Sequence, residues 1–98
     1  MLKVIAQIYI ANEADLDAVL ALYQQLADES RKEDGCGKYE IYQNLKDPTH
    51  LVVDELWESE AHLQAHAQSA HYTAIVPQAA PFACPNREKS IQLFTQRI

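Results

Sequence analysis

The stretch "HLVVDELWESEAHLQAHAQ", residues 50–68, decides the fold because its hydrophobic period changes part-way along. Its first half alternates between two faces, which is the period of a strand, so we predict a strand over 50–58. One face of this strand carries Leu51, Val53, Glu55 and Trp57. Ser59 follows as a candidate N-cap, and Glu60 suits the first turn of a helix, which we expect over 60–68.

The N-terminal half of the chain contains the same two hydrophobic periodicities, that of a strand and that of a helix. Residues 2–10 alternate like a strand, and 13–33 carry apolar residues at spacings of three and four, which indicates an amphipathic helix. Asn12 is the candidate N-cap of that helix. A second strand over 38–44 and the turn 45–50, which contains an Asp-Pro pair, complete a hairpin with the strand described above.

The C-terminal part of the chain supplies the last predicted helix and the last predicted strand. Ser69 is a second candidate cap, and a short helix is expected over 70–76. Three of the four prolines fall in 77–86, which indicates a connecting loop, and 87–96 is expected to be a fourth strand. The order β-α-β-β-α-β predicts a ferredoxin-like α+β fold in one domain, 1–98: an antiparallel sheet with helices on one face. Because the first and third strands have apolar residues on both faces, we expect a homodimer through the sheets.

Composition limits the partners and the location. Eight Lys and Arg against fourteen Asp and Glu give a net charge of −6, which argues against binding nucleic acid or anionic membranes. No signal-peptide pattern opens the chain, and no segment approaches the roughly 18 apolar residues of a membrane span, so we expect a cytoplasmic protein. Cys36 and Cys84 lie in no CxxC pair and are expected to be free thiols, with a disulfide as the alternative.

Two residues at the end of the third predicted strand have two interpretations each. Trp57 is either a core aromatic or the wall of a pocket at the junction of strand and helix. If Glu55 faces inward, its carboxylate must find a partner or become protonated; if its face is partly solvated, it has no special role. The residues alone leave both questions open.

The histidines that follow are candidates for metal binding or acid–base chemistry. His62 and His66 are one helical turn apart, but HxxxH is a weak metal motif and no third ligand has an implied spacing, so we expect packed or surface histidines and no metal. His71 and Tyr72 begin the next helix, where the dipole favours a neutral imidazole that can act as a base or acceptor. Helix-end packing is the alternative. With only two glycines, the chain contains no GxSxG, Walker or GxGxxG loop.

The segment "DELWESEAHLQAHAQSAHYTAI" (54–75) resembles the antibiotic biosynthesis monooxygenase family, in which a strand ends in E-x-W, a histidine follows nine residues after the tryptophan, and an S-x-H segment comes next. The matching residues are Glu55, Trp57, Glu58, His66, Ser69 and His71. The opening "MLKVIAQIYI" and the turn "KEDGCGKYEIY" are similar to the quinol monooxygenase branch. The resemblance extends over nearly the whole chain.

This resemblance implies a dimeric α+β barrel with a pocket between sheet and helices in each subunit. It implies an enzyme that oxidises a small phenol, quinol or anthrone with dioxygen and needs no cofactor. His66 would be the base and Trp57 the stacking wall. The expected substrate-binding residues are Val53, Glu55, Leu63, His71 and Tyr72.

The sequence departs from two branches of the family. Val53 and Leu63 stand where the anthrone-oxidising branch has asparagine and tyrosine, which leaves that branch's substrate geometry in doubt. His66 and Val76 replace the tryptophan and histidine of the haem-degrading branch, which argues against haem degradation. Two alternatives stay open: an isomerase or degradation enzyme for a small sugar-like signal, and a non-catalytic dimer that binds a small aromatic.

Overall fold

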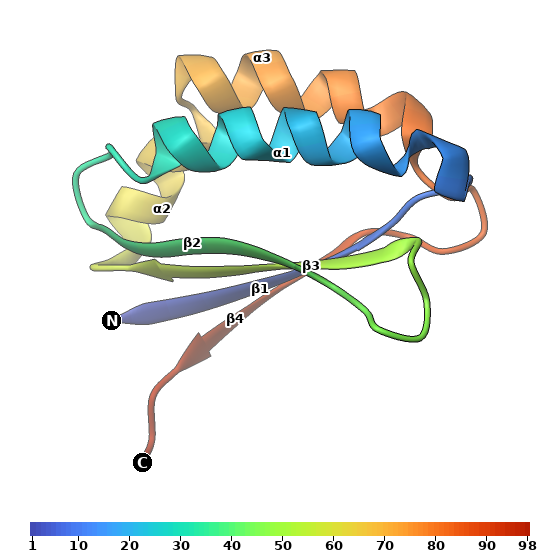
Figure 1. Ribbon diagram of the computed structural model, residues 1–98. Coiled ribbons are helices and arrows are strands. Elements are labelled where there is room, and N and C mark those ends of the chain that lie inside the picture. The colour runs from blue at the N-terminus through green and yellow to red at the C-terminus, as the bar shows by residue number, and fades with distance from the viewer.

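The computed structural model describes residues 1–98 and has an α+β architecture. Its elements are β1 (Leu2–Tyr9), η1 (Glu13–Asp15), α1 (Leu16–Ser30), β2 (Cys36–Gln43), β3 (His50–Trp57), α2 (Glu60–Ala67), α3 (Ala70–Ala79), η2 (Ala80–Phe82) and β4 (Ser90–Thr95). The strands form one antiparallel sheet in the order β2-β3-β1-β4. Helices α1 and α3 lie over one face of this sheet and leave the other face uncovered (Figure 1). The predicted ferredoxin-like fold is confirmed.

Side-chain caps start two of the three α-helices. Ser59 Oγ accepts a hydrogen bond from the backbone N–H of His62 at the start of α2, and Ser69 Oγ does the same for Tyr72 at the start of α3. Both predicted caps are therefore confirmed. Asn12 makes no side-chain cap bond, and the chain enters α1 through the 3₁₀ turn η1 instead, so that prediction was wrong.

The helix predicted over 13–33 ends early, and this places an acidic residue in the interior. Helix α1 ends at Ser30, a turn follows, and Gly35 adopts a positive φ of 82° that leads directly into β2 at Cys36. The side chain of His62 packs so closely on Gly35 that an added Cβ would lie 2.3 Å from its ring. Glu33 consequently sits in the turn, where its side chain bends back under the helices.

The segment after Ser69 is more helical than its prolines suggested. Helix α3 continues through Pro77 to Ala79, and η2 occupies part of the predicted loop 77–86. A proline removes one backbone donor, but this helix packs along α1 over most of its length, and that packing is enough to continue it. Strand β4 is shorter than the predicted 87–96.

The core lies between the sheet and the pair α1 and α3, and it includes the inward face of β3. The buried residues of this face are Leu51, Val53, Glu55 and Trp57. In the sheet register Glu55 pairs with Val4 on one side and Tyr39 on the other, at the centre of the core face. Cys36 and Cys84 are both free. No helix combines the length and the apolar character needed to cross a membrane.

Candidate active site

Two adjoining cavities lie between the sheet and the helices. The outer cavity has a volume of about 230 Å³ and the inner one about 20 Å³. Both are lined by Ile8, Tyr23, Val76 and Lys89, so they form one recess. Apart from tyrosines, its lining is apolar except for Lys89, which lines both parts, and Glu55, which lines the inner end. An apolar recess with few polar groups is the usual form of a small-molecule site.

Glu55 is the carboxyl group at the inner end of the recess. Its residue is only 6% exposed, and Oε1 accepts a hydrogen bond of 3.0 Å from Trp57 Nε1–H. Burial raises the pKa of Glu55 to about 7, although the Trp57 bond and the charge of Lys89 act to lower that pKa. The group can therefore both accept and donate a proton near neutral pH.

His66 lies directly behind Glu55, away from the recess. It is 1% exposed, its Nδ1 lies 2.5 Å from Glu33 Oε2, and its Nε2 has no hydrogen-bond partner. The nearest acidic atom to Nε2 is Glu55 Oε1, at 3.9 Å. Burial lowers the pKa of His66, with Glu33 acting in the opposite direction, so the imidazole is neutral at pH 7.

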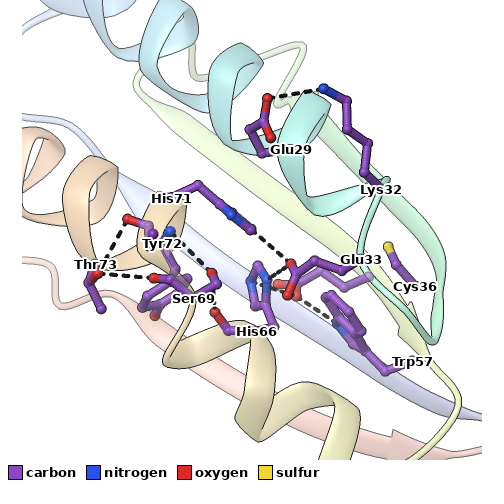
Figure 2. Close-up of polar contacts among 12 residues, drawn as sticks. Glu29, Lys32, Glu33, Cys36, Trp57, His66, Ser69, His71, Tyr72 and Thr73 are labelled. Carbon is purple, nitrogen blue, oxygen red and sulfur yellow. Dashed lines mark hydrogen bonds and ion pairs between the residues drawn. The ribbon is translucent and has the colours of Figure 1, made fainter.

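Two imidazoles converge on Glu33. His71 Nε2 lies 3.0 Å from Glu33 Oε2, the oxygen that also contacts His66, and Figure 2 shows both rings directed at this carboxylate. The three side chains bring one ligand atom each within 4.8 Å of one another, as a metal site would require. His62 belongs to a different cluster with Asp34 and Glu58, so the two histidines of the HxxxH motif do not share a site.

Aromatic rings enclose His66. The ring centroids of Trp57, Tyr72 and Tyr39 lie 4.6, 5.0 and 5.5 Å from that of His66. Trp57 is fully buried against His66 and is not among the residues lining the recess, so the core interpretation of this residue is the one that the geometry supports. Its indole N–H nevertheless contacts the carboxyl group that faces the recess.

The predicted substrate-binding residues divide into two groups. Val53, Glu55 and Tyr72 line the inner cavity. Leu63 packs against the core, and His71 contacts Glu33; neither is among the lining residues of the recess.

Three further residues of the recess and its surroundings were not predicted from sequence. Glu33 falls at the end of the helix predicted over 13–33, Tyr23 lies within that helix, and Lys89 lies within the strand predicted over 87–96. Burial raises the pKa of Tyr23 to about 12, which keeps its hydroxyl protonated as a donor. Although Lys89 is an exposed residue, desolvation lowers the pKa of its side chain, which lines both cavities, while Glu55 raises that pKa.

Comparison with known proteins identifies a matching family, a relative and similar solved structures. The model of a family described as antibiotic biosynthesis monooxygenase matches residues 1–78. YcnE of Bacillus subtilis (strain 168), named as a candidate monooxygenase, is 27% identical over 74 residues, covering 74% of this chain and 78% of that protein. A solved structure of an antibiotic biosynthesis monooxygenase is 34% identical over all of both chains, with a TM-score of 0.91. A conserved protein from Methanosarcina mazei Go1 is 27% identical with a TM-score of 0.90, covering 98% of this chain and 92% of that one.

Proposed function

Because the chain belongs to the antibiotic biosynthesis monooxygenase family, we propose that it oxidises a small quinol or related phenol with dioxygen and without a bound cofactor. One observation carries this proposal. A buried acid with a pKa of about 7 lines the smaller cavity of a recess that is otherwise mainly apolar. Such a site can ionise a phenolic hydroxyl while keeping water away from the reacting ring.

The proposed reaction begins with proton transfer. The Glu55 carboxylate takes the proton of the substrate hydroxyl, and the electron pair stays on the phenolate oxygen. The electron-rich ring then reduces dioxygen by four electrons in all. One oxygen atom becomes bonded to a ring carbon, giving a hydroxyquinone from a quinol, and the other leaves as water after the protons return. His66 serves as the base behind Glu55, and Trp57 holds the carboxyl group in place.

The lining of the recess supports a small, flat substrate. The outer cavity of about 230 Å³ is below the roughly 300–1,000 Å³ typical of drug-sized ligands, which favours one or two fused rings. Burial raises the pKa of Tyr72 as well as that of Tyr23, so both hydroxyls stay protonated and can donate to a phenolate oxygen. Lys89 is the one cationic side chain in the lining and favours the anionic form of the substrate.

A second copy of the chain is the proposed partner. Family members are commonly dimers, and one face of the sheet in this chain is not covered by helices (Figure 1). Met1 and Phe94 are exposed there beside Leu56, around a hollow of about 410 Å³. Burying such a surface against a symmetric partner is the usual way to cover it.

Oxygen uptake tests the proposed activity. Chelator-treated protein would be mixed with a panel of hydroquinones, naphthoquinols and anthrones, and wild type compared with Glu55→Gln and His66→Ala. We expect uptake above autoxidation that falls at least about a hundredfold in both variants. Glu58→Gln, which removes an exposed carboxylate after the same strand, is the matched control and should keep the wild-type rate. Uptake equal to autoxidation for every compound would refute the proposal, and oxygen-independent turnover of a sugar-like compound would favour the isomerase.

A further inference from the structure

Glu33 determines where His66 carries its hydrogen. A carboxylate can only accept hydrogen bonds, so the contacts of 2.5 Å from His66 Nδ1 and 3.0 Å from His71 Nε2 require a hydrogen on each of these nitrogens. A neutral imidazole has one N–H, and its other nitrogen is then an acceptor. His66 Nε2 is therefore left with a lone pair.

That lone pair belongs to a buried nitrogen near Glu55. His66 Nε2 is buried and has no hydrogen-bond partner among the protein atoms, which is uncommon for a buried polar atom. Glu55 Oε1 lies 3.9 Å away, beyond hydrogen-bond distance, so a protonated Glu55 can pass its proton to His66 once the two side chains move closer together. The pairing of His66 Nδ1 with the Glu33 carboxylate matches the imidazole–carboxylate half of a catalytic triad, in which the carboxylate fixes the tautomer of the histidine.

We propose that Glu33 is a positioning residue: it holds His66 as the Nδ1–H tautomer and stabilises the imidazolium that forms when Glu55 passes on the substrate's proton. This inference rests on the proposed function. One proton leaves the Glu55 carboxyl group, one N–H bond forms at His66 Nε2, and the electron pair of the broken O–H bond restores the Glu55 carboxylate. The same proton later returns to the oxygen atom that leaves as water. His71 donates to the same Glu33 oxygen and so restrains it.

The same three side chains could instead hold a metal ion, and the contacts distinguish the two possibilities. A cation bound by Glu33, His66 and His71 would displace the hydrogen from His66 Nδ1. The separation of 2.5 Å between Glu33 Oε2 and His66 Nδ1 suits a hydrogen bond and is shorter than the roughly 3.3 Å between two ligand atoms that each lie about 2.0 Å from a tetrahedral zinc ion. The geometry therefore favours the hydrogen-bonded arrangement.

Nitrogen NMR of ¹⁵N-histidine-labelled protein tests the assignment without using activity. In chelator-treated wild type at pH 7 we expect His66 to show an N–H at Nδ1 and an unprotonated Nε2. Glu33→Ala removes the acceptor, so a population with the hydrogen on Nε2 should appear. Glu33→Gln keeps a carbonyl oxygen for both imidazoles but removes the charge, so the tautomer should persist while the pKa of His66 falls, because Glu33 raises that pKa. Glu29→Gln changes an exposed carboxylate on α1 and should alter neither property.

Kinetics complete the test on any substrate that supports oxygen uptake. We expect Glu33→Gln to lower kcat about tenfold or more with KM changed less than about twofold, and to move the pH profile in the same direction as the pKa of His66. A wild-type His66 with its hydrogen on Nε2, an unchanged tautomer in Glu33→Ala, or loss of the Nδ1 hydrogen with one equivalent of Zn²⁺ would each overturn the proposal. If wild type consumes no oxygen, the proposed function fails while the NMR result still decides the role of Glu33. If Glu33→Ala does not fold, Glu33→Gln retains the test.

Discussion

At the scale of single residues, Glu55 makes the stability of the protein depend on pH. Its folded pKa of about 7 lies above the usual 4.5, so between these values the native state binds more protons than the unfolded state. Stability should therefore fall as pH rises from about 4.5 to about 7, by up to roughly 3 kcal/mol. Urea denaturation at pH 4.5 and pH 8 should show this fall in wild type and a much smaller one in Glu55→Gln. Equal pH dependence in the two proteins would contradict the assignment.

Trp57 influences this carboxyl group through one hydrogen bond. The indole N–H lowers the pKa of Glu55, so Trp57→Phe should raise that pKa above about 7 while keeping most of the aromatic packing. Titration of the ¹³C-labelled glutamate carboxyl signals would measure the change. Tyr72→Phe, which removes a hydroxyl that makes no bond to Glu55, should have a much smaller effect. A lower pKa in Trp57→Phe would contradict the role of the indole.

Site residues that lie close together in the sequence could be assigned to one site more easily than site residues that lie far apart. Glu55, Trp57 and His66 occur within one strand–helix unit, and the prediction placed them in one site. Whether Glu55 faced inward stayed open because a strand pattern with a single charge on its apolar face fits both orientations. The pairing of β3 with β1 and β2 resolves the question, since it places Glu55 between Val4 and Tyr39 in the core.

At the scale of elements, the two serine caps carry a measurable part of the stability of α2 and α3. Ser69 accepts a hydrogen bond from the backbone of α3 and donates one of 2.6 Å to the carbonyl of His66, so it joins the two helices. Ser69→Ala should destabilise the protein by about 1 kcal/mol or more. Asn12→Ala is the matched control: its side chain caps nothing, and the cost should be close to zero. Chemical denaturation would measure both, and equal costs would contradict the cap assignment.

The order of helices and strands could be predicted from the spacing of apolar residues along the sequence. Some of the element boundaries, however, depend on tertiary contacts. The helix predicted over 13–33 continued its polar and apolar spacing into the turn, and no local signal marked Ser30 as its end. Gly35, with its positive φ and its contact with His62, fixes the turn, and that contact joins segments far apart in sequence. Glu33 was missed for this reason. The continuation of α3 past Pro77 likewise depends on packing against α1.

At the scale of the whole molecule, the uncovered sheet face predicts a dimer of about 22 kDa from two chains of 11.1 kDa each. Phe94 pairs with Lys3 on this face and is 47% exposed. Lys3 is already paired with Asp54 at 2.6 Å, so a carboxylate at position 94 would lose its hydration in a dimer without a free cation to offset the cost. Phe94→Glu should therefore shift sedimentation toward the monomer. Leu45→Glu changes a fully exposed residue in the β2–β3 turn and should leave the dimer intact. A monomeric wild type would contradict the interface.

The recess itself could not be predicted from sequence because it is formed by segments distant along the chain. Tyr23 comes from α1, Val76 from α3, and Lys89 from the segment before β4, and each fits a simpler local interpretation. The family resemblance implied a pocket between sheet and helices. It indicated Glu55 as a substrate-binding residue, but it did not indicate that His66 would lie outside the lining.

Strand β4 forms an edge of the sheet, pairs only with β1 and is the least buried of the four strands. Ile91 and the preceding Lys89 nevertheless complete the wall of the inner cavity. Local opening of this strand would uncover the recess without disturbing the core, and edge segments with few buried contacts open most easily. Backbone amides of β4 should therefore exchange with deuterium sooner than those of β3, and a ligand in the recess should slow β4 the most. The fraying of this strand would then control how often a substrate can enter.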